Sequence, residues 1–87
     1  MLIKRENRVY EIIRGSSVSN EGINGKYLEL YDVTVLPHEQ LLSAFYSDQD
    51  NSLTFSAYRQ DLPFSLVEIF VAQVRKDIAP VIENMTK

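Results

Sequence analysis

The sequence predicts an α+β domain, in which an antiparallel sheet of three to four strands has one amphipathic C-terminal helix packed on one face. Strand-like segments rich in β-branched and aromatic residues, separated by turn residues, occupy residues 9–58. A single segment with helical periodicity follows them, as is typical of this class. The 87 residues, 45% hydrophobic and 24% charged, suit one hydrophobic core, so residues 1–87 are expected to form a single domain.

The first predicted strand covers Val9–Arg14, and an extension back to Leu2 is left open. Residues 15–26 hold all three glycines of the chain and are expected to form a loop. Because Asn24-Gly25 is a good two-residue turn, this segment is either a hairpin or an open loop.

The longest predicted strand is Lys26–Leu36, which Pro37 ends. Its apolar residues before and after Tyr31-Asp32 fall on opposite faces of the strand. A bulge at that point would turn both groups toward one core.

The clearest hairpin joins the predicted strands Leu41–Ser47 and Ser52–Tyr58 around the polar residues 48–51. The connection is either a four-residue loop or a two-residue turn at Asp50-Asn51, and both alternatives place the same side chains on each face of the hairpin. One face pairs Tyr46 with Leu53, Ala44 with Phe55 and Leu42 with Ala57; the other pairs Phe45 with Thr54, Ser43 with Ser56 and Leu41 with Tyr58.

The helix is expected to begin at Ser65, because Ser65 and Glu68 have the spacing of a capping box. Phe64 and Ile69 stand at the positions of a hydrophobic staple. The helix should end before Pro80. Its buried row, spaced by four residues, is formed by Leu66, Phe70, Val74 and Ile78.

One helix can cover only one face of such a sheet. The hairpin register places Leu41, Phe45 and Tyr58 on the uncovered face, joined by tyrosines of residues 27–36. Such a patch exceeds what a monomer usually exposes, and tyrosine suits interfaces because a large apolar ring carries a polar tip. We expect this face to bind a protein, unless residues 81–87 form a second helix over it.

Negative charge is concentrated in the middle of the chain. Residues 27–74 contain seven acidic residues and one basic residue, so their formal charges sum to −6, whereas the whole chain carries −3. Such a field repels nucleic acid and attracts a cationic partner. The acids expected to lie exposed and to contribute to partner binding are Glu29, Asp32, Asp48, Asp50 and Asp61, together with the aromatic residues Phe45 and Tyr58.

No catalytic or metal-binding motif stands out in the sequence. His38 is the only histidine, and no serine is tied to it by spacing. The acidic residues 48–52 resemble the start of a calcium loop, but Leu53 and Arg59 replace the glycine and glutamate that an EF-hand requires. Without such a motif, we expect a protein that is not an enzyme and uses no cofactor or metal. The chain has no cysteine, which suits a cytoplasmic protein, and no long apolar run, so we expect it not to contact membranes.

Residues 53–80 resemble the C-terminal half of small bacterial immunity proteins, which neutralise toxins delivered by a competitor, including toxins of contact-dependent inhibition systems. In both, a strand ending in a polar turn leads through a Leu-Pro step, here Leu62-Pro63, into one amphipathic helix. The resemblance is one of pattern and carries over no site residue. It implies a small, acidic, cytosolic protein that binds a basic toxin domain by electrostatic steering around aromatic anchors.

These observations predict a protein-binding domain that neutralises a cationic partner, as an immunity protein blocks a bacterial toxin. The alternative is a small homodimeric structural or regulatory module that associates through the uncovered sheet face. An enzyme without a recognisable motif ranks third.

Overall fold

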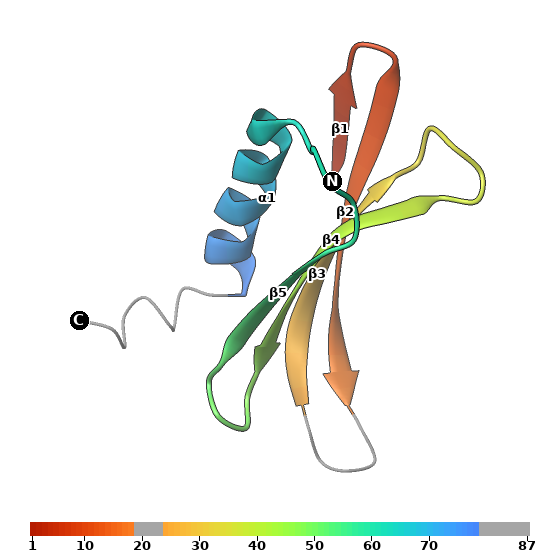
Figure 1. The fold of residues 1–87 in the computed structure, drawn as a ribbon. Helices are drawn as coiled ribbons and strands as arrows, with labels where there is room; N and C mark the ends of the chain where they lie inside the picture. Colours follow the sequence, from red (N-terminus) through yellow and green to blue (C-terminus); the bar gives the residue numbers. More distant parts are fainter. Residues whose placement is uncertain (19–23, 79–87) are drawn as a thin grey trace.

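The computed structural model describes residues 1–18 and 24–78 of the chain. In this part a five-stranded antiparallel sheet has one helix packed against one face (Figure 1), which confirms the α+β class but shows the predicted strand number to be too small. Neighbouring strands are also consecutive in the sequence. The elements are β1 (Leu2–Arg5), β2 (Arg8–Val18), β3 (Asn24–Asp32), β4 (Glu39–Ser47), β5 (Leu53–Ala57) and α1 (Phe64–Asp77).

The additional strand comes from the N-terminus. The sequence does not decide whether the first strand extends back to Leu2. These residues form a separate strand, β1, which pairs antiparallel with β2 and places Arg5 opposite Arg8. Glu6 and Asn7 form the two-residue turn between them, and Glu6 has a φ of 51°. Positive φ is common in such turns because their twist matches that of the strands, but glutamate gives no sequence signal for it.

The predicted loop over residues 15–26 is wrong at both ends. Strand β2 continues through Gly15 to Val18, and Asn24-Gly25 begins β3 instead of forming a turn. Both glycines lie under aromatic rings: a Cβ at Gly15 would fall 2.5 Å from Cζ of Tyr27, and one at Gly25 2.6 Å from Cζ of Phe45. The missing side chain at these two positions therefore makes room for an aromatic ring to lie close over the sheet.

A bulge occurs where one was expected, but the extra residue lies on the neighbouring strand. Leu30 pairs with Leu42 and Tyr31 with Gln40, which leaves Leu41 between them without a partner on β3. Both Leu41 and Leu42 are consequently buried in the core. Strand β3 ends at Asp32, four residues before the predicted end.

The β4–β5 hairpin is confirmed in register. Tyr46 pairs with Leu53, and the two strands remain in phase as far as Leu42 opposite Ala57. One predicted orientation fails: the side chain of Leu41 belongs to the core because of the bulge and does not share a face with Tyr58.

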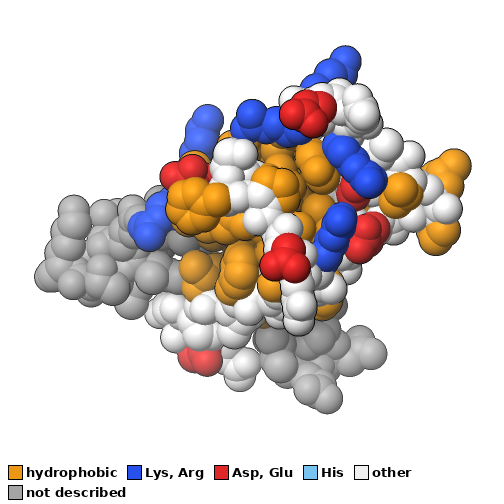
Figure 2. Space-filling model, turned by 45° about the horizontal axis from the view of Figure 1, so that its top comes forward, with side chains coloured by type: hydrophobic (Ala, Val, Ile, Leu, Met, Phe, Trp, Pro, Cys, Tyr) orange, Lys and Arg blue, Asp and Glu red, His pale blue; other side chains and the backbone are white. Residues whose placement is uncertain are grey.

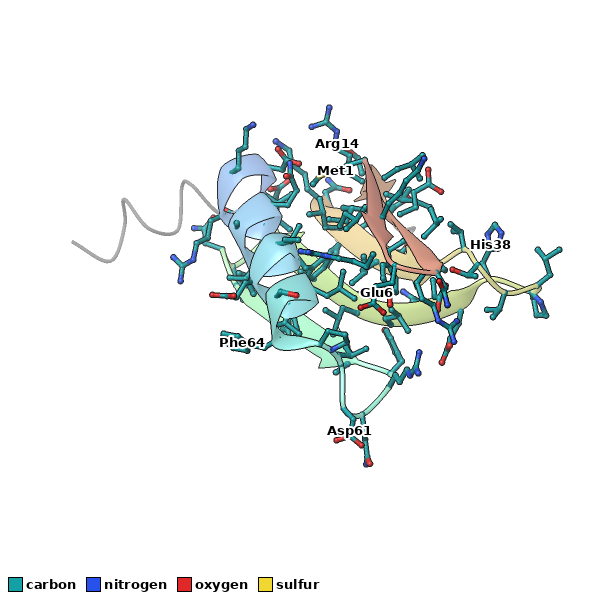
Figure 3. All side chains as sticks on the ribbon, turned by 90° about the horizontal axis from the view of Figure 1, so that it is seen from above. Met1, Glu6, Arg14, His38, Asp61 and Phe64 are labelled. Atoms are coloured by element: carbon teal, nitrogen blue, oxygen red, sulfur yellow. The ribbon has the colours of Figure 1, made fainter. Side chains whose placement is uncertain are left out.

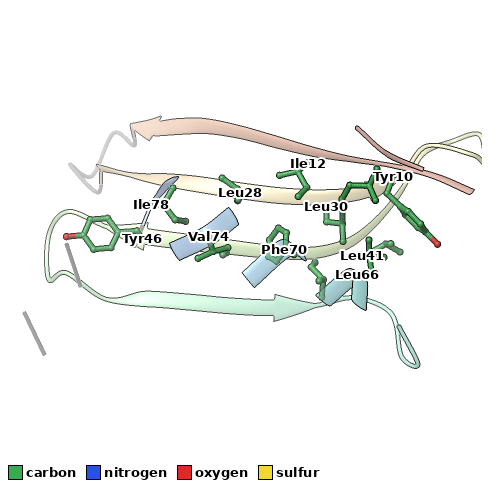
Figure 4. Close-up of a cluster of buried hydrophobic side chains, with 13 residues drawn as sticks. Tyr10, Ile12, Leu28, Leu30, Leu41, Tyr46, Leu66, Phe70, Val74 and Ile78 are labelled. Carbon is green, nitrogen blue, oxygen red and sulfur yellow. The ribbon is translucent and has the colours of Figure 1, made fainter. Parts of the chain in front are cut away.

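The core lies between the sheet and α1 (Figure 4). Phe70 is fully buried, and its ring lies 6.1 Å from that of Phe55 on β5. The expected helical row is confirmed as the buried side of α1. The complete cluster consists of Ile3, Tyr10, Ile12, Leu28, Leu30, Leu41, Leu42, Ala44, Tyr46, Leu66, Phe70, Val74 and Ile78.

The predicted capping box at Ser65 is wrong. The N-cap residue is Pro63, and no side chain caps the helix. Phe64 is 74% exposed, so it forms no staple with Ile69. With Pro63 as N-cap the staple positions shift to Leu62 and Val67, and both of these pack against the core. The expectations for residues 79–87 lie outside the described residues.

Candidate protein-binding surface

The face of the sheet opposite α1, here called the open face, has no helix over it in the described part of the chain (Figure 1). Side chains alternate along each strand, so the register decides which residues it presents. Among the polar and aromatic residues that it presents are Glu11 on β2, Tyr27, Glu29 and Tyr31 on β3, Gln40, Ser43 and Phe45 on β4, and Tyr58 directly after β5.

One end of the open face is covered by two aromatic rings. Tyr27 stands opposite Gly15 on one side and Phe45 on the other. Because the ring of Tyr27 lies over Gly15 and that of Phe45 reaches Gly25, both side chains lie flat on the sheet and are half-buried. They are held in place before any partner arrives, which lowers the entropy lost on binding.

Glu29 occupies the middle of the open face and is oriented by two neighbours. The Tyr31 hydroxyl donates to Oε1 of Glu29 at 3.3 Å, and Nε2 of Gln40 donates to Oε2 at 3.2 Å. Burial raises the pKa of Tyr31, and the negative charge of Glu29 raises it further. The hydroxyl thus stays protonated at neutral pH and remains a donor.

Tyr58 forms the far border of the open face. Its hydroxyl lies 3.0 Å from Oγ of Ser43 on β4, while 58% of the residue remains exposed. The hydrogen bond holds the hydroxyl end of the Tyr58 side chain, while the rest of the residue stays largely exposed to solvent. An exposed ring of fixed orientation is the kind of residue that anchors protein interfaces.

The charge of the open face is negative. Glu11 lies opposite Tyr31 and diagonally across from Glu29, and both glutamates are half-buried residues. On β2 to β5, as far as the structure describes them, this face carries no lysine or arginine; Lys4 stands on it at the β1 edge. Carboxylates beside aromatic rings suit a guanidinium or ammonium group, which can pair with the acid and stack on the ring.

The structure brings together some of the predicted binding residues. Glu29, Phe45 and Tyr58 share the open face. Leu41 was expected with them, but it is fully buried on the other side of the sheet.

Asp32 was expected to be exposed, and this is wrong. It is fully buried, where Oδ2 pairs with Nη1 of Arg8 at 2.9 Å and Oδ1 accepts the backbone N–H of Thr34 at 2.9 Å. Burial alone would raise the pKa of Asp32, but the bonds from Thr34 and the charge of Arg8 outweigh it and hold the pKa below its usual value. Asp32 therefore stabilises the fold.

The remaining predicted acids lie at separate places. Asp48 and Asp50 are in the β4–β5 turn, and Asp61 is in the loop after β5, beyond the opposite end of that strand (Figure 3). Oδ1 of Asp50 accepts hydrogen bonds from the hydroxyl and the backbone N–H of Ser52, which lower its pKa. The acidic segment of the sequence is thus not one acidic surface, and Figure 2 shows acidic side chains interspersed with Lys and Arg.

Sequence reasoning missed Glu11 and Gln40 as members of the open face. Glu11 lies in the first predicted strand, outside the acidic segment, and only its pairing with Tyr31 places it beside Glu29. Gln40 precedes the bulge, so simple alternation from Leu42 gives it the wrong face. Alternation of side chains along β2 places Glu11 on the same face as Ile13. That this face is the one that carries Glu29 follows only from the pairing of β2 with β3.

Within the part of the chain that the structure describes, no cluster of metal-binding side chains accompanies the open face. His38 is exposed in the connection after β3, on the opposite side from α1 in Figure 3. Residues 1–18 and 24–78 contain no group of three or more His, Asp or Glu side chains placed to hold a metal ion.

Comparisons with protein-family models, curated proteins and solved structures found no match. Within the described residues, no helix has the length and apolar character needed to cross a membrane.

Proposed function

We propose that this chain is a cytoplasmic protein-binding domain that neutralises a cationic partner, acting as an immunity protein against a bacterial toxin domain. The open face is the proposed contact surface, and neither nucleic acid nor a membrane is a partner. The observation that carries the proposal is the pair of half-buried glutamates, Glu11 and Glu29, set beside aromatic rings on a face whose described cation is Lys4 at the β1 edge.

The chemistry of this surface favours a basic protein. An arginine or lysine of the partner would meet a carboxylate already oriented by Tyr31 and Gln40, and an aromatic ring beside it. Preorganised, partly dehydrated acids bind such groups more strongly than acids on flexible exposed loops. The proposed contact therefore centres on Glu29 and not on the acids of the turns.

Homodimerisation through the open face, the alternative function, is less well supported. It would bury Glu11 and Glu29 of both copies, while the described part of β2 to β5 supplies no lysine or arginine on this face to pair with them. Burying a carboxylate without a cationic partner is costly. A basic protein resolves this charge more fully than a second copy, whose cation on the described part of this face is Lys4 at the β1 edge.

The test is co-expression with the toxin domain encoded beside this chain's gene. The chain should restore growth of cells that express the toxin and should co-purify with it. The variant Glu11→Gln with Glu29→Gln keeps the side-chain shapes and should protect less well. Absence of a neighbouring toxin gene, or growth arrest that the chain does not relieve, would overturn the proposal.

A further inference from the structure

The two edge strands of the sheet differ in chemistry. Strand β1 carries Lys4 and Arg5, which discourage pairing with another strand. Strand β5 (Leu53–Ala57, LTFSA) has no charge and no proline, pairs with β4 without a bulge, and is exposed along its whole length. An uncharged edge strand can pair with a strand of another chain through its unpaired backbone N–H and C=O groups. Proteins normally either block such pairing or bind a partner strand there.

The register identifies the free backbone groups of β5. Ser47 N–H donates to the Ser52 carbonyl, and Tyr58 N–H donates to the Leu41 carbonyl. Hydrogen-bonded pairs alternate along an antiparallel ladder, so the residues of even number between them, Thr54 and Ser56, also bond to β4. The N–H and C=O groups that point away from the sheet are those of Leu53, Phe55 and Ala57.

An apolar border accompanies this edge on the α1 side of the sheet. Phe55 is 53% exposed despite its ring contact with Phe70, and Phe64 at the start of α1 is 74% exposed. The flank of α1 carrying Asp77 faces β2, where Arg14 pairs with it at 3.5 Å. Phe64 stands on the other flank of the helix, and Figure 3 shows it directed away from the sheet.

We infer that β5 pairs antiparallel with β5 of a second copy of this chain, about a two-fold axis at Phe55, to give one continuous sheet across the dimer. The strand is self-complementary in this register. Leu53 meets Ala57 and Phe55 meets its own copy on the α1 side, while Thr54 meets Ser56 on the open-face side. The outward N–H and C=O groups of Leu53, Phe55 and Ala57 then all find partners.

This dimer is independent of the proposed function. It uses the edge of the sheet and leaves Glu29 and the rest of the open face accessible on both copies. It also brings no like charges into contact within the paired strands, because β5 contains none.

The first measurement is the mass of the full chain in solution by sedimentation equilibrium at concentrations from about 1 to 100 μM, a range that covers micromolar dissociation constants. The inference predicts a dimer over this range. A chain that stays monomeric throughout, including one whose β5 edge instead serves a strand of another protein, would overturn it.

Two matched variants then test the register. Leu53→Lys with Ala57→Lys places like charges directly opposite each other across the two-fold axis, whereas Leu53→Lys with Ala57→Glu places opposite charges there. Within one chain the two positions are four residues apart on an extended strand, about 13 Å, so each variant leaves the monomer with similar interactions.

We expect the first variant to weaken dimerisation about tenfold or more and the second to retain the dimer. Circular dichroism of both variants should match the parent chain. Two variants with equal dimer affinities would contradict the proposed β5 register, and a dimer unaffected by the first variant would place the interface elsewhere.

Discussion

The carboxylate of Asp32 ties together three segments of the chain. It closes the end of β3, pairs with Arg8 at the start of β2 and accepts the N–H of Thr34 in the following connection. Beside it, the hydroxyl of Thr34 accepts the backbone N–H of Val9 at 2.8 Å. A buried acid with these partners contributes to the free energy of unfolding, unlike the exposed acids of the turns.

Replacing Asp32 with asparagine should therefore lower the free energy of unfolding by about 1–3 kcal/mol at neutral pH, since the charge-assisted bond to Arg8 is lost. The pKa of Asp32 is lower in the folded chain than in the unfolded one. Its contribution is thus present above the unfolded pKa of about 3.9 and is lost as the pH falls through the folded pKa.

The measurement is urea unfolding of the parent chain and of Asp32→Asn between neutral and acidic pH. The difference between the two proteins should shrink below pH of about 4. Asp48→Asn, which changes an exposed carboxyl, is the matched control and should leave stability nearly unchanged. Equal effects of the two substitutions would contradict the structural role of Asp32.

Two residues of α1 should differ strongly in their effect on stability. Phe70→Ala should cost about 3–5 kcal/mol, because the fully buried ring leaves a cavity in the core. Ser65→Ala should stay within about 0.5 kcal/mol, because no side chain caps this helix. Urea midpoints check both values; a loss of about 1 kcal/mol at Ser65 would restore the capping box that the sequence predicted.

At the scale of elements, the central β2–β3 hairpin depends on glycines that lie under aromatic rings. A Cβ at Gly25 would fall 2.1 Å from the backbone oxygen of Tyr46, which the sheet holds in place. A Cβ at Gly15 would meet only the far end of the Tyr27 side chain, which can move aside.

Gly25→Ala should therefore lower the free energy of unfolding by about 1–3 kcal/mol through overpacking. Gly15→Ala should change it by less than about 1 kcal/mol, since the added cost of moving Tyr27 is offset by reduced freedom of the unfolded chain. Thermal unfolding of the two variants provides the comparison. A larger loss at Gly15 than at Gly25 would contradict the described packing.

Elements governed by local chemistry were predictable from the sequence. The β4–β5 register followed from a polar turn between two alternating segments, and the buried row of α1 followed from its period. The β1–β2 turn was not predictable, because its residue with positive φ is Glu6, which is neither glycine nor asparagine. The sequence predicted the end of a strand at Gly15, because its packing partner, the ring of Tyr27, lies on a different strand and is not visible in the local sequence.

The candidate site was predictable only in part, because most of it depends on contacts between distant residues. Phe45 and Tyr58 followed from the hairpin alone. The burial of Asp32 depends on Arg8, which is 24 positions away in the sequence. The bulge moved Leu41 into the core, and a single extra residue on one strand is invisible to simple alternation.

At the scale of the whole molecule, the described chain divides its surface into three parts. The helix covers the core, the open face presents aromatic rings around Glu29, and the β5 edge remains unpaired. The central claim is that the open face makes the contact with a cationic partner. Acids elsewhere should contribute to long-range attraction only.

The most direct test is stopped-flow binding to the toxin domain at low and high salt, using two variants that remove the same charge. Glu11→Gln with Glu29→Gln changes the open face, whereas Asp48→Asn with Glu68→Gln changes exposed acids on the β4–β5 turn and on α1. Both should slow association at low salt, since each weakens the attraction that salt screens. Only the open-face pair should also raise the dissociation rate, by about tenfold or more, because only it loses direct contacts. Equal dissociation rates for the two variants would contradict the claim and place the contact away from the open face.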